Sequence, residues 1–160
     1  MLGRFKSLLI ADDGEKYSPE GIEEAFTEQS HFIDQVMLHN NQRPYTIALL
    51  YPNKEAIRRH LRNNGILPDS ERGIEEALKM IELELLRYRT NGEYGEMFPQ
   101  RWLPAAIGLL PERFTEENRM MNSTMKMVRG VITDHYQELR NYMYEPNGKN
   151  ILNPRNMDTM

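Results

Sequence analysis

The alternation of short apolar runs with longer amphipathic segments is the feature that most constrains the fold of this chain. Four runs have the length and apolar content of β-strands, and they span residues 5–11, 31–39, 45–51 and 102–110. The segments between and after them repeat apolar residues at three- and four-residue spacing, which is typical of helices with one buried face. Their order, β-α-β-β-α-α-β-α, predicts an α+β fold in which helices pack on a small mixed or antiparallel sheet.

Turn and capping residues mark the ends of these elements. Gly14 closes the first apolar run and can take a positive φ. Ser18 is placed to cap a helix that starts at the following Pro-Glu pair. The turn-rich link 40–44 has the length of a hairpin connection between the second and third runs. The longest helix is predicted over residues 71–89, with Ser70 as its cap.

The C-terminal part of the chain predicts an edge strand, a helix and a polar tail. Pro104 interrupts the fourth apolar run and favours an edge or entry position, because proline cannot donate to a strand ladder. A last helix is predicted over residues 128–144, with His135 on its apolar face as a core histidine and not a ligand. The polar, Asn-rich segment 146–160 is expected to be loosely held, so residues 1–145 form the single expected domain.

Composition and charge exclude several classes of function. The 160 residues are enough for one hydrophobic core, and the formal net charge of -4 makes nucleic acid a poor default partner. The absence of cysteine excludes disulfides and thiolate metal sites, and the four histidines show no ligand spacing, so we expect no metal ligands. No apolar run approaches the roughly 20 residues that span a bilayer. The N-terminal run is too short for a signal peptide. A soluble, cytoplasmic protein is therefore expected.

Two stretches contain residues suited to chemistry, although each also fits an ordinary structural role. The first begins with the cationic segment Gly3–Lys6 and continues through the turn at Gly14 to a helix start, which by itself fits a strand, turn and helix with solvated lysines. The second is Asn122–Arg129, where polar capping residues precede Lys126 and Arg129. These two cations are neighbours if they share a helical turn. Alternatively, Lys126 lies on the loop before the helix and projects freely.

Taken together and in this order, the two stretches resemble the C-terminal domain of the adenylate-forming ligases, which include acyl-CoA synthetases, peptide-synthetase adenylation domains and luciferases. Gly3–Lys6 is similar to the family's hinge pattern Gly-Arg-x-(Lys/Asp), and Pro19–Glu23 is similar to the helix that follows a Gly turn. Thr124–Arg129 is similar to the stretch that carries the adenylation lysine. The resemblance runs from Gly3 to about Tyr144 and implies a small lid domain.

One departure from the family pattern indicates a branch. Met125 stands where many members have glycine before the lysine. Together with the segments Trp102–Pro104 and Phe114–Asn118, this departure resembles the long-chain fatty acyl-CoA synthetases. The resemblance gives neither the acyl chain length nor the acceptor, which is either coenzyme A or a carrier-protein thiol.

The resemblance implies roles for six residues in a reaction with two halves. Lys126 would be the catalytic residue of adenylation, in which a carboxylate attacks ATP to give an acyl adenylate and pyrophosphate. Arg4 would bind the ribose hydroxyls of the nucleotide, and Lys6 would be the hinge about which the domain rotates. After rotation the turn that contains Gly14, Glu15 and Lys16 would face the coenzyme A channel, with Gly14 allowing close approach and Lys16 able to meet phosphate.

The same resemblance implies partners and cofactors that lie mostly outside this chain. ATP and Mg would be bound mainly by an N-terminal adenylation domain, with coenzyme A and a fatty acid as co-substrates, and a membrane surface would be reached only through the parent enzyme. The sequence has no Gly-rich Ser/Thr phosphate loop, so we expect a fragment that starts at the hinge and is inactive alone. The alternative is a free-standing interaction module that keeps the lid fold and uses helix 71–89 as its contact surface.

Overall fold

A three-stranded sheet built from the longest apolar runs forms the centre of the protein, whose computed structural model describes residues 8–160. Strands β3 (Ile33–His39) and β5 (Thr46–Pro52) pair antiparallel, and β6 (Pro104–Leu109) pairs parallel with β5. The order β3-β5-β6 places β5 in the middle, where almost all of its residues are buried. The predicted mixed sheet is confirmed, and Pro104 begins an edge strand as expected.

A second, smaller sheet contains the turn that includes Gly14. Strands β1 (Leu9–Ala11) and β2 (Lys16–Tyr17) form a short antiparallel hairpin, and β4 (Asn41–Arg43) pairs parallel with β1. The link between β3 and β5 was predicted as a hairpin connection, and it also supplies strand β4 to this second sheet. The start of β1 is held by a hydrogen bond of 3.1 Å from the backbone N–H of Ile10 to the carbonyl of Asn40.

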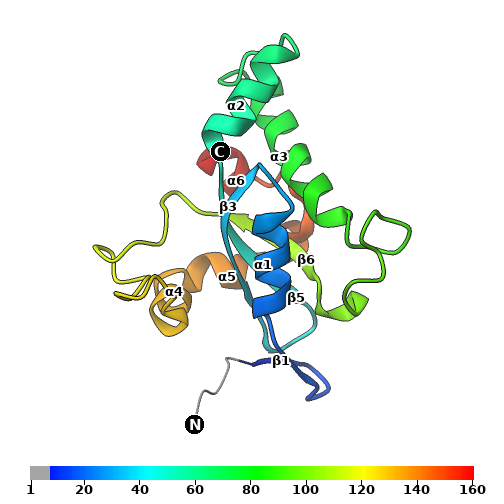
Figure 1. The fold of residues 1–160 in the computed structure, drawn as a ribbon, viewed down its shortest axis with the longest axis vertical. Helices are drawn as coiled ribbons and strands as arrows, with labels where there is room; N and C mark the ends of the chain where they lie inside the picture. The colour runs from blue at the N-terminus through cyan, green and yellow to red at the C-terminus, as the bar shows by residue number, and fades with distance from the viewer. Residues whose placement is uncertain (1–7) are drawn as a thin grey trace.

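Helices cover both faces of the central sheet, as Figure 1 shows. One face is covered by α1 (Glu20–Glu28) and α3 (Glu71–Leu86), and α2 (Lys54–Asn63) pairs with α3 at the top of the view. The other face is covered by α4 (Arg129–His135) and α5 (Gln137–Met143). None of the helices within residues 8–160 is long and apolar enough to cross a bilayer.

The alternation of side chains along β5 divides the core into two clusters. Ala48 and Leu50 join the cluster under α1, α2 and α3, whereas Ile47 and Leu49 join the cluster under α4 and α5. All four side chains are fully buried. Complete burial of each of the three larger side chains, Ile47, Leu49 and Leu50, contributes about 1.5–3 kcal/mol. Strand β5 is therefore the element on which both helical layers depend.

The two predicted serine caps have different outcomes. Ser70 caps α3 as expected, because its hydroxyl accepts a hydrogen bond of 3.0 Å from the backbone N–H of Gly73. Ser18 does not cap α1: the N-cap is Pro19, and the Ser18 hydroxyl donates instead to the carboxylate of Glu20 at 2.7 Å. The serine is one residue too early to reach the orphan N–H groups of the first turn.

The predicted last helix is two helices in the structure. The chain bends at Tyr136, whose φ of -104° and ψ of 29° end α4 and begin α5. The bend lets Ile132 from α4 and Leu139 from α5 enter the same apolar cluster. The prediction for His135 is wrong, since its side chain is exposed to solvent. In a single straight helix His135 would lie on the buried face, but with the bend at Tyr136 its side chain lies in solvent.

The C-terminal segment is packed against the sheet, which corrects the prediction of a loosely held tail. After a 3₁₀ turn, η2 (Pro146–Lys149), the chain ends in α6 (Pro154–Thr159). The buried amide of Asn156 accepts from the backbone N–H of Leu109 at 3.0 Å and donates to the carbonyl of Ile107 at 2.9 Å. One side-chain amide thus pairs with the free edge of β6 as a neighbouring strand would. Asn-rich composition indicated looseness, but here an asparagine supplies the hydrogen bonds.

Replacement of Asn156 tests this edge contact. We expect Asn156→Ala to lower the free energy of unfolding by about 1–3 kcal/mol, because the buried N–H of Leu109 loses its acceptor. Urea unfolding followed by circular dichroism measures this. The exposed Asn147 in η2 provides the matched control, and Asn147→Ala should change stability by no more than about 0.5 kcal/mol. Equal effects of the two variants would contradict the proposed pairing.

Candidate functional site

Lys126 lies on a tight hairpin that precedes α4. Met121 and Met127 form an antiparallel bridge, and the backbone N–H of Asn122 donates to the carbonyl of Lys126 at 2.9 Å. The N–H of Met125 donates to the carbonyl of Asn122 at 3.0 Å, which closes a turn over the two intervening positions. Of the two alternatives left open by the sequence, the loop position is therefore correct: Lys126 precedes the helix and does not share a helical turn with Arg129.

The tip of this hairpin is fixed by one side chain and one unusual backbone conformation. The side-chain oxygen of Asn122 accepts hydrogen bonds from the N–H groups of Thr124 and Lys126, at 2.9 and 3.1 Å. Met125 has a φ of +62°, a left-handed conformation in which a side chain is strained. A three-residue hairpin loop commonly ends in such a residue, and glycine is favoured there. The turn geometry thus explains why many members of the resembled family have glycine at this position.

A bidentate ion pair between Glu23 and Arg129 anchors the hairpin to the rest of the domain. One guanidinium nitrogen donates to Glu23 Oε2 at 2.8 Å, and the other donates to Oε1. Glu23 Oε2 also accepts from the backbone N–H of Leu38 on β3 at 2.7 Å. Glu23 is only 5% exposed. The carboxylate therefore joins α1, β3 and the start of α4 through three hydrogen bonds.

The charge state of this pair follows from its surroundings. Burial opposes the charged form of Arg129, but the hydrogen bond and the negative charge of Glu23 outweigh it and raise the pKa of the guanidinium. Burial, together with the positive charges of Arg140 and Arg129, lowers the pKa of His39 to about 4. At neutral pH the His39 imidazole is uncharged and adds no repulsion to the Arg129 guanidinium.

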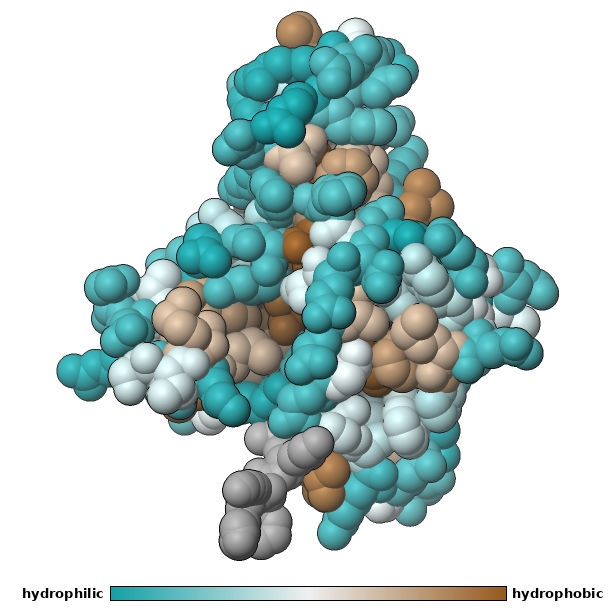
Figure 2. Space-filling model, viewed as in Figure 1, coloured by the Kyte–Doolittle hydropathy of each residue, from teal (hydrophilic) through white to brown (hydrophobic). Residues whose placement is uncertain are grey.

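The ammonium of Lys126 lies at the edge of a cleft between the hairpin, α1 and β3. Carboxylates of Glu20, Glu24 and Asp34 line this cleft, together with apolar side chains, and Figure 2 shows apolar atoms at its floor to the left of α1. Lys126 is exposed, and no carboxylate within residues 8–160 forms an ion pair with it. The backbone of Lys126 is thus fixed while its charged end can move.

The second predicted segment, the turn with Gly14, Glu15 and Lys16, lies elsewhere on the domain. Figure 1 shows the β1–β2 hairpin at the bottom of the view and the segment before α4 at the left. Gly14 has a φ of +92°, as expected for the turn, and all three residues are exposed. The structure therefore does not bring Lys126 and this turn together. Arg4 and Lys6 lie outside the described residues.

The sequence did not predict the ion pairs of Arg101 and of Arg129, nor a cavity beside α3. Arg101 forms ion pairs with the β1–β2 turn, a contact that no local pattern indicates. A role for Glu23 could have been suspected, because a carboxylate that directly follows the core residue Ile22 falls near the apolar face of α1. Of the described residues, no group of three or more His, Asp or Glu is arranged to hold a metal ion.

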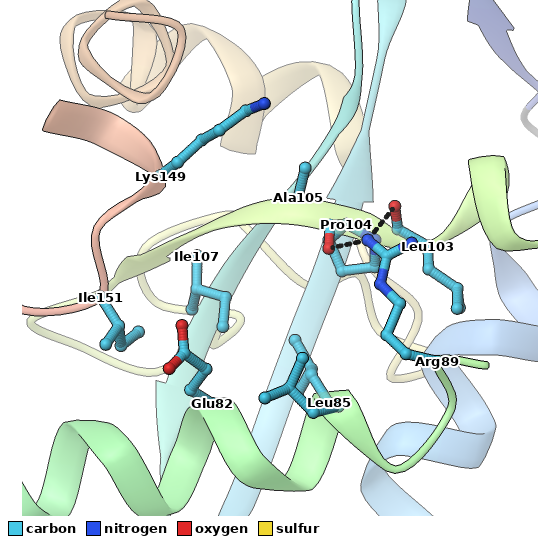
Figure 3. Close-up of a pocket in the computed structure, with 10 residues that line it drawn as sticks. Glu82, Leu85, Arg89, Leu103, Pro104, Ala105, Ile107, Lys149 and Ile151 are labelled. Carbon is cyan, nitrogen blue, oxygen red and sulfur yellow. Dashed lines mark hydrogen bonds between the residues drawn. The ribbon is translucent and has the colours of Figure 1, made fainter. Parts of the chain in front are cut away.

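The cavity lies between α3, β6 and the C-terminal segment, as Figure 3 shows. Leu85 and Ile107 contribute apolar walls, and Lys149 lies at its rim. The guanidinium of Arg89 donates to the carbonyl of Pro104 at 3.0 Å, and burial lowers its pKa. Arg89 is therefore engaged in holding the start of β6 against the end of α3.

Comparison with known proteins agrees with this geometry. Residues 6–82 match the family model described as the AMP-binding enzyme C-terminal domain. The match covers 77 of the 160 residues, and over them the chain is similar to that family. Solved structures extend the fold similarity: the adenylation domain of a carboxylate reductase from Mycobacterium chelonae has a TM-score of 0.67 at 22% identity and covers 86% of this chain. The corresponding domain from Segniliparus rugosus gives 0.66 at 19% identity, again over 86% of the chain. The predicted α+β fold is thereby confirmed.

Curated proteins similar to this chain include a fatty acid ligase and an acyl-CoA synthetase of a plant. A chloroplastic long-chain-fatty-acid–[acyl-carrier-protein] ligase of Arabidopsis thaliana is 28% identical over 142 residues, which is 89% of this chain and 17% of the relative. Long chain acyl-CoA synthetase 8 of the same plant is 25% identical over 150 residues, 90% of this chain and 20% of the relative. The chain thus spans a fifth or less of their length, and covers 19% of each of the two solved structures.

Removal of one partner from the Glu23–Arg129 pair tests the anchor. We expect Arg129→Met to lower the free energy of unfolding by about 3 kcal/mol or more, because Glu23 is left as a buried unpaired charge. The Glu23→Gln, Arg129→Met double variant should recover part of the loss, since the glutamine can still accept from Leu38. Urea unfolding measures the free energy of unfolding of both variants. Arg59→Met, which removes an exposed pair with Glu55, should cost no more than about 1 kcal/mol, and a similar value for Arg129→Met would contradict the anchor.

Substitution of Met125 tests the strained turn. The side chain is 67% exposed, so Met125→Gly loses little packing and removes the left-handed strain. We expect its stability to stay unchanged or to rise by up to about 1 kcal/mol. Met97 is also exposed but lacks a positive φ, and Met97→Gly should lose about 0.5–1 kcal/mol. Thermal unfolding compares the two. If Met125→Gly is as destabilising as Met97→Gly, the turn is not strained as described.

Proposed function

We propose that this domain is the lid of an AMP-forming fatty acid ligase and supplies Lys126 to the adenylation step. The family match and the fatty acid ligase relatives support the class of reaction. The position of Lys126 carries the residue assignment: its backbone is fixed by a hairpin and by the Glu23–Arg129 anchor, while its ammonium is exposed and unpaired within residues 8–160.

The chemistry of adenylation needs such a charge. A carboxylate oxygen attacks the α-phosphorus of ATP, a P–O bond forms, and the bond to the departing pyrophosphate breaks. Two anions must approach one another, so a cation between the carboxylate and the α-phosphate stabilises the transition state. An ammonium on a flexible stem suits a group that must enter the site for one step and leave it for the next.

The second half-reaction uses a different face of the domain. The acceptor thiol attacks the carbonyl carbon of the acyl adenylate, a C–S bond forms, AMP leaves, and the thiol proton is lost. In this proposal rotation about Lys6 removes Lys126 and brings the turn of Gly14, Glu15 and Lys16 to the acceptor channel. The distance in the fold between the two hairpins supports a rotation, because one fixed orientation cannot present both to one site.

The remaining parts of the active site belong to the partner domain. An N-terminal adenylation domain would bind the fatty acid and most of the ATP, with Arg4 reaching the ribose. The acceptor is coenzyme A or a carrier-protein thiol; one relative is named as an acyl-carrier-protein ligase and another as an acyl-CoA synthetase. A cytoplasmic location stays a prediction, and two of the relatives are named as chloroplastic.

Substitution of Lys126 tests the proposal. In the parent ligase we expect Lys126→Ala to slow pyrophosphate release about 10²–10³-fold, the range found when one electrostatic stabiliser is removed. Thioester formation from preformed acyl adenylate should be largely retained. Lys79 on α3 is likewise exposed, and Lys79→Ala should leave both steps unchanged. Undiminished pyrophosphate release in Lys126→Ala would refute the assignment.

A non-catalytic interaction module is the second candidate, and one observation favours it. Leu83 and Leu86 on α3 are 60% and 46% exposed and are three residues apart, so they form an exposed apolar pair on one side of the helix that fits a contact with another protein. In that case Leu83→Ser and Leu86→Ser would weaken the association and Lys126→Ala would leave it unchanged, whereas in a ligase Lys126→Ala slows adenylation. The kinetic measurements on Lys126→Ala therefore distinguish the two functions.

A further inference from the structure

Arg101 holds the tip of the β1–β2 hairpin from a distant part of the chain. It lies in the 3₁₀ turn η1 (Gln100–Trp102). Its Nη1 is 3.0 Å from Asp13 Oδ2 and 3.1 Å from Glu15 Oε1, and its Nη2 is 3.9 Å from Asp12 Oδ1. Three carboxylates of one turn thus surround a single guanidinium, and Arg101 lies 88 positions after Asp13 in the sequence.

The next residue, Trp102, holds the base of the same hairpin. Its ring stacks on Tyr17 at the end of β2, with centroids 5.4 Å apart and planes 14° from parallel. The Tyr17 hydroxyl forms a buried hydrogen bond with the Thr46 hydroxyl and accepts another, of 3.2 Å, from the Asn40 amide. The base of the hairpin is therefore anchored to the sheet, and η1 contacts both its base and its tip.

Apart from Arg101, the hydrogen bonds that hold the tip are local, and they include one of 3.1 Å from the backbone N–H of Glu15 to Asp13 Oδ1. Strand β2 has two residues, and the turn is closed by backbone hydrogen bonds from Ala11 to Glu15 and from Gly14 to Ala11. A hairpin this short has marginal stability in water. The carboxylates of Asp12, Asp13 and Glu15 repel one another unless a cation lies among them. The hydrogen bond from Arg101 lowers the pKa of Asp13, so the arginine stabilises the ionised turn.

We propose that Arg101 is a positioning residue for the thioester half-reaction. It fixes the turn of Gly14, Glu15 and Lys16 in the shape that the turn presents to the acceptor. A single exposed ion pair contributes little, but three carboxylates on one guanidinium form a network that constrains orientation. This inference rests on the proposed function, in which the turn faces the acceptor channel.

Arg101 also reduces the net negative charge of the turn that an anionic acceptor would approach. The turn carries three carboxylates, and the only cations within it or in ion-pair contact with it among residues 8–160 are Lys16 and Arg101. Without Arg101 the negative charge increases and the lysine alone opposes it. Coenzyme A carries phosphate groups, so loss of Arg101 weakens its approach through repulsion as well as through disorder of the turn.

Kinetics of the separate half-reactions test this role in the parent ligase. For Arg101→Ala we expect kcat/KM for coenzyme A, measured with preformed acyl adenylate, to fall about tenfold, mainly through KM. Pyrophosphate release in adenylation should stay within about twofold of the unmodified enzyme. Arg101→Lys should restore part of the loss, because it keeps the charge and loses the planar fork. Arg59→Ala, which removes another exposed arginine with one ion pair, should change neither step.

Amide hydrogen exchange gives a readout that does not depend on activity. We expect the N–H groups of Gly14 and Glu15 to exchange faster in Arg101→Ala than in the unmodified chain, with β5 unaffected. Unchanged exchange at the turn, unchanged KM for coenzyme A, or an equal loss in both half-reactions would overturn the positioning role. If Lys126→Ala behaves as expected in any of these cases, this inference fails and the proposed function stands. If Lys126→Ala leaves adenylation intact, the proposed function itself fails.

Discussion

The buried ion pair between Glu23 and Arg129 is the contact on which the arrangement of the domain depends. It joins α1, β3 and the start of α4, and so fixes the hairpin of Lys126 against the sheet. Removal of two charges from water is costly, and only bidentate geometry with further hydrogen bonds offsets that cost. The backbone N–H of Leu38 supplies one such bond. A looser contact here would leave the lysine attached to a mobile loop.

The two candidate functional segments share one design. Each is a short hairpin with an exposed tip, and each is held by an ion pair between residues far apart in the sequence. Arg129, which follows the first hairpin, pairs with Glu23 on α1, and Arg101 of η1 pairs with the turn of the second. A fixed backbone with a free charged end suits a domain that presents different groups in turn to one active site. The apolar clusters on both faces of β5 provide the rigid body that the proposed rotation would require.

Periodicity predicted the strands and most helices because burial repeats every two residues in a strand and every three to four in a helix. It failed where a single side chain overrides the pattern. The bend at Tyr136 divides the last helix and exposes His135. The amide of Asn156 fixes a tail whose composition indicated looseness. Proximity in the sequence suggested Ser18 as a cap, but the chain enters α1 through Pro19.

The sequence by itself determined the α+β class, the resemblance to the adenylate-forming ligases and the choice of Lys126, because these depend on local order and motif spacing. Tertiary structure decided which charges meet. Glu23 and Arg129 are 106 positions apart, and Arg101 is 88 positions from Asp13. It also showed that Met125 takes a left-handed conformation. No local pattern encodes such contacts, since an ion pair between distant residues forms only after the packed sheet and helices bring them together.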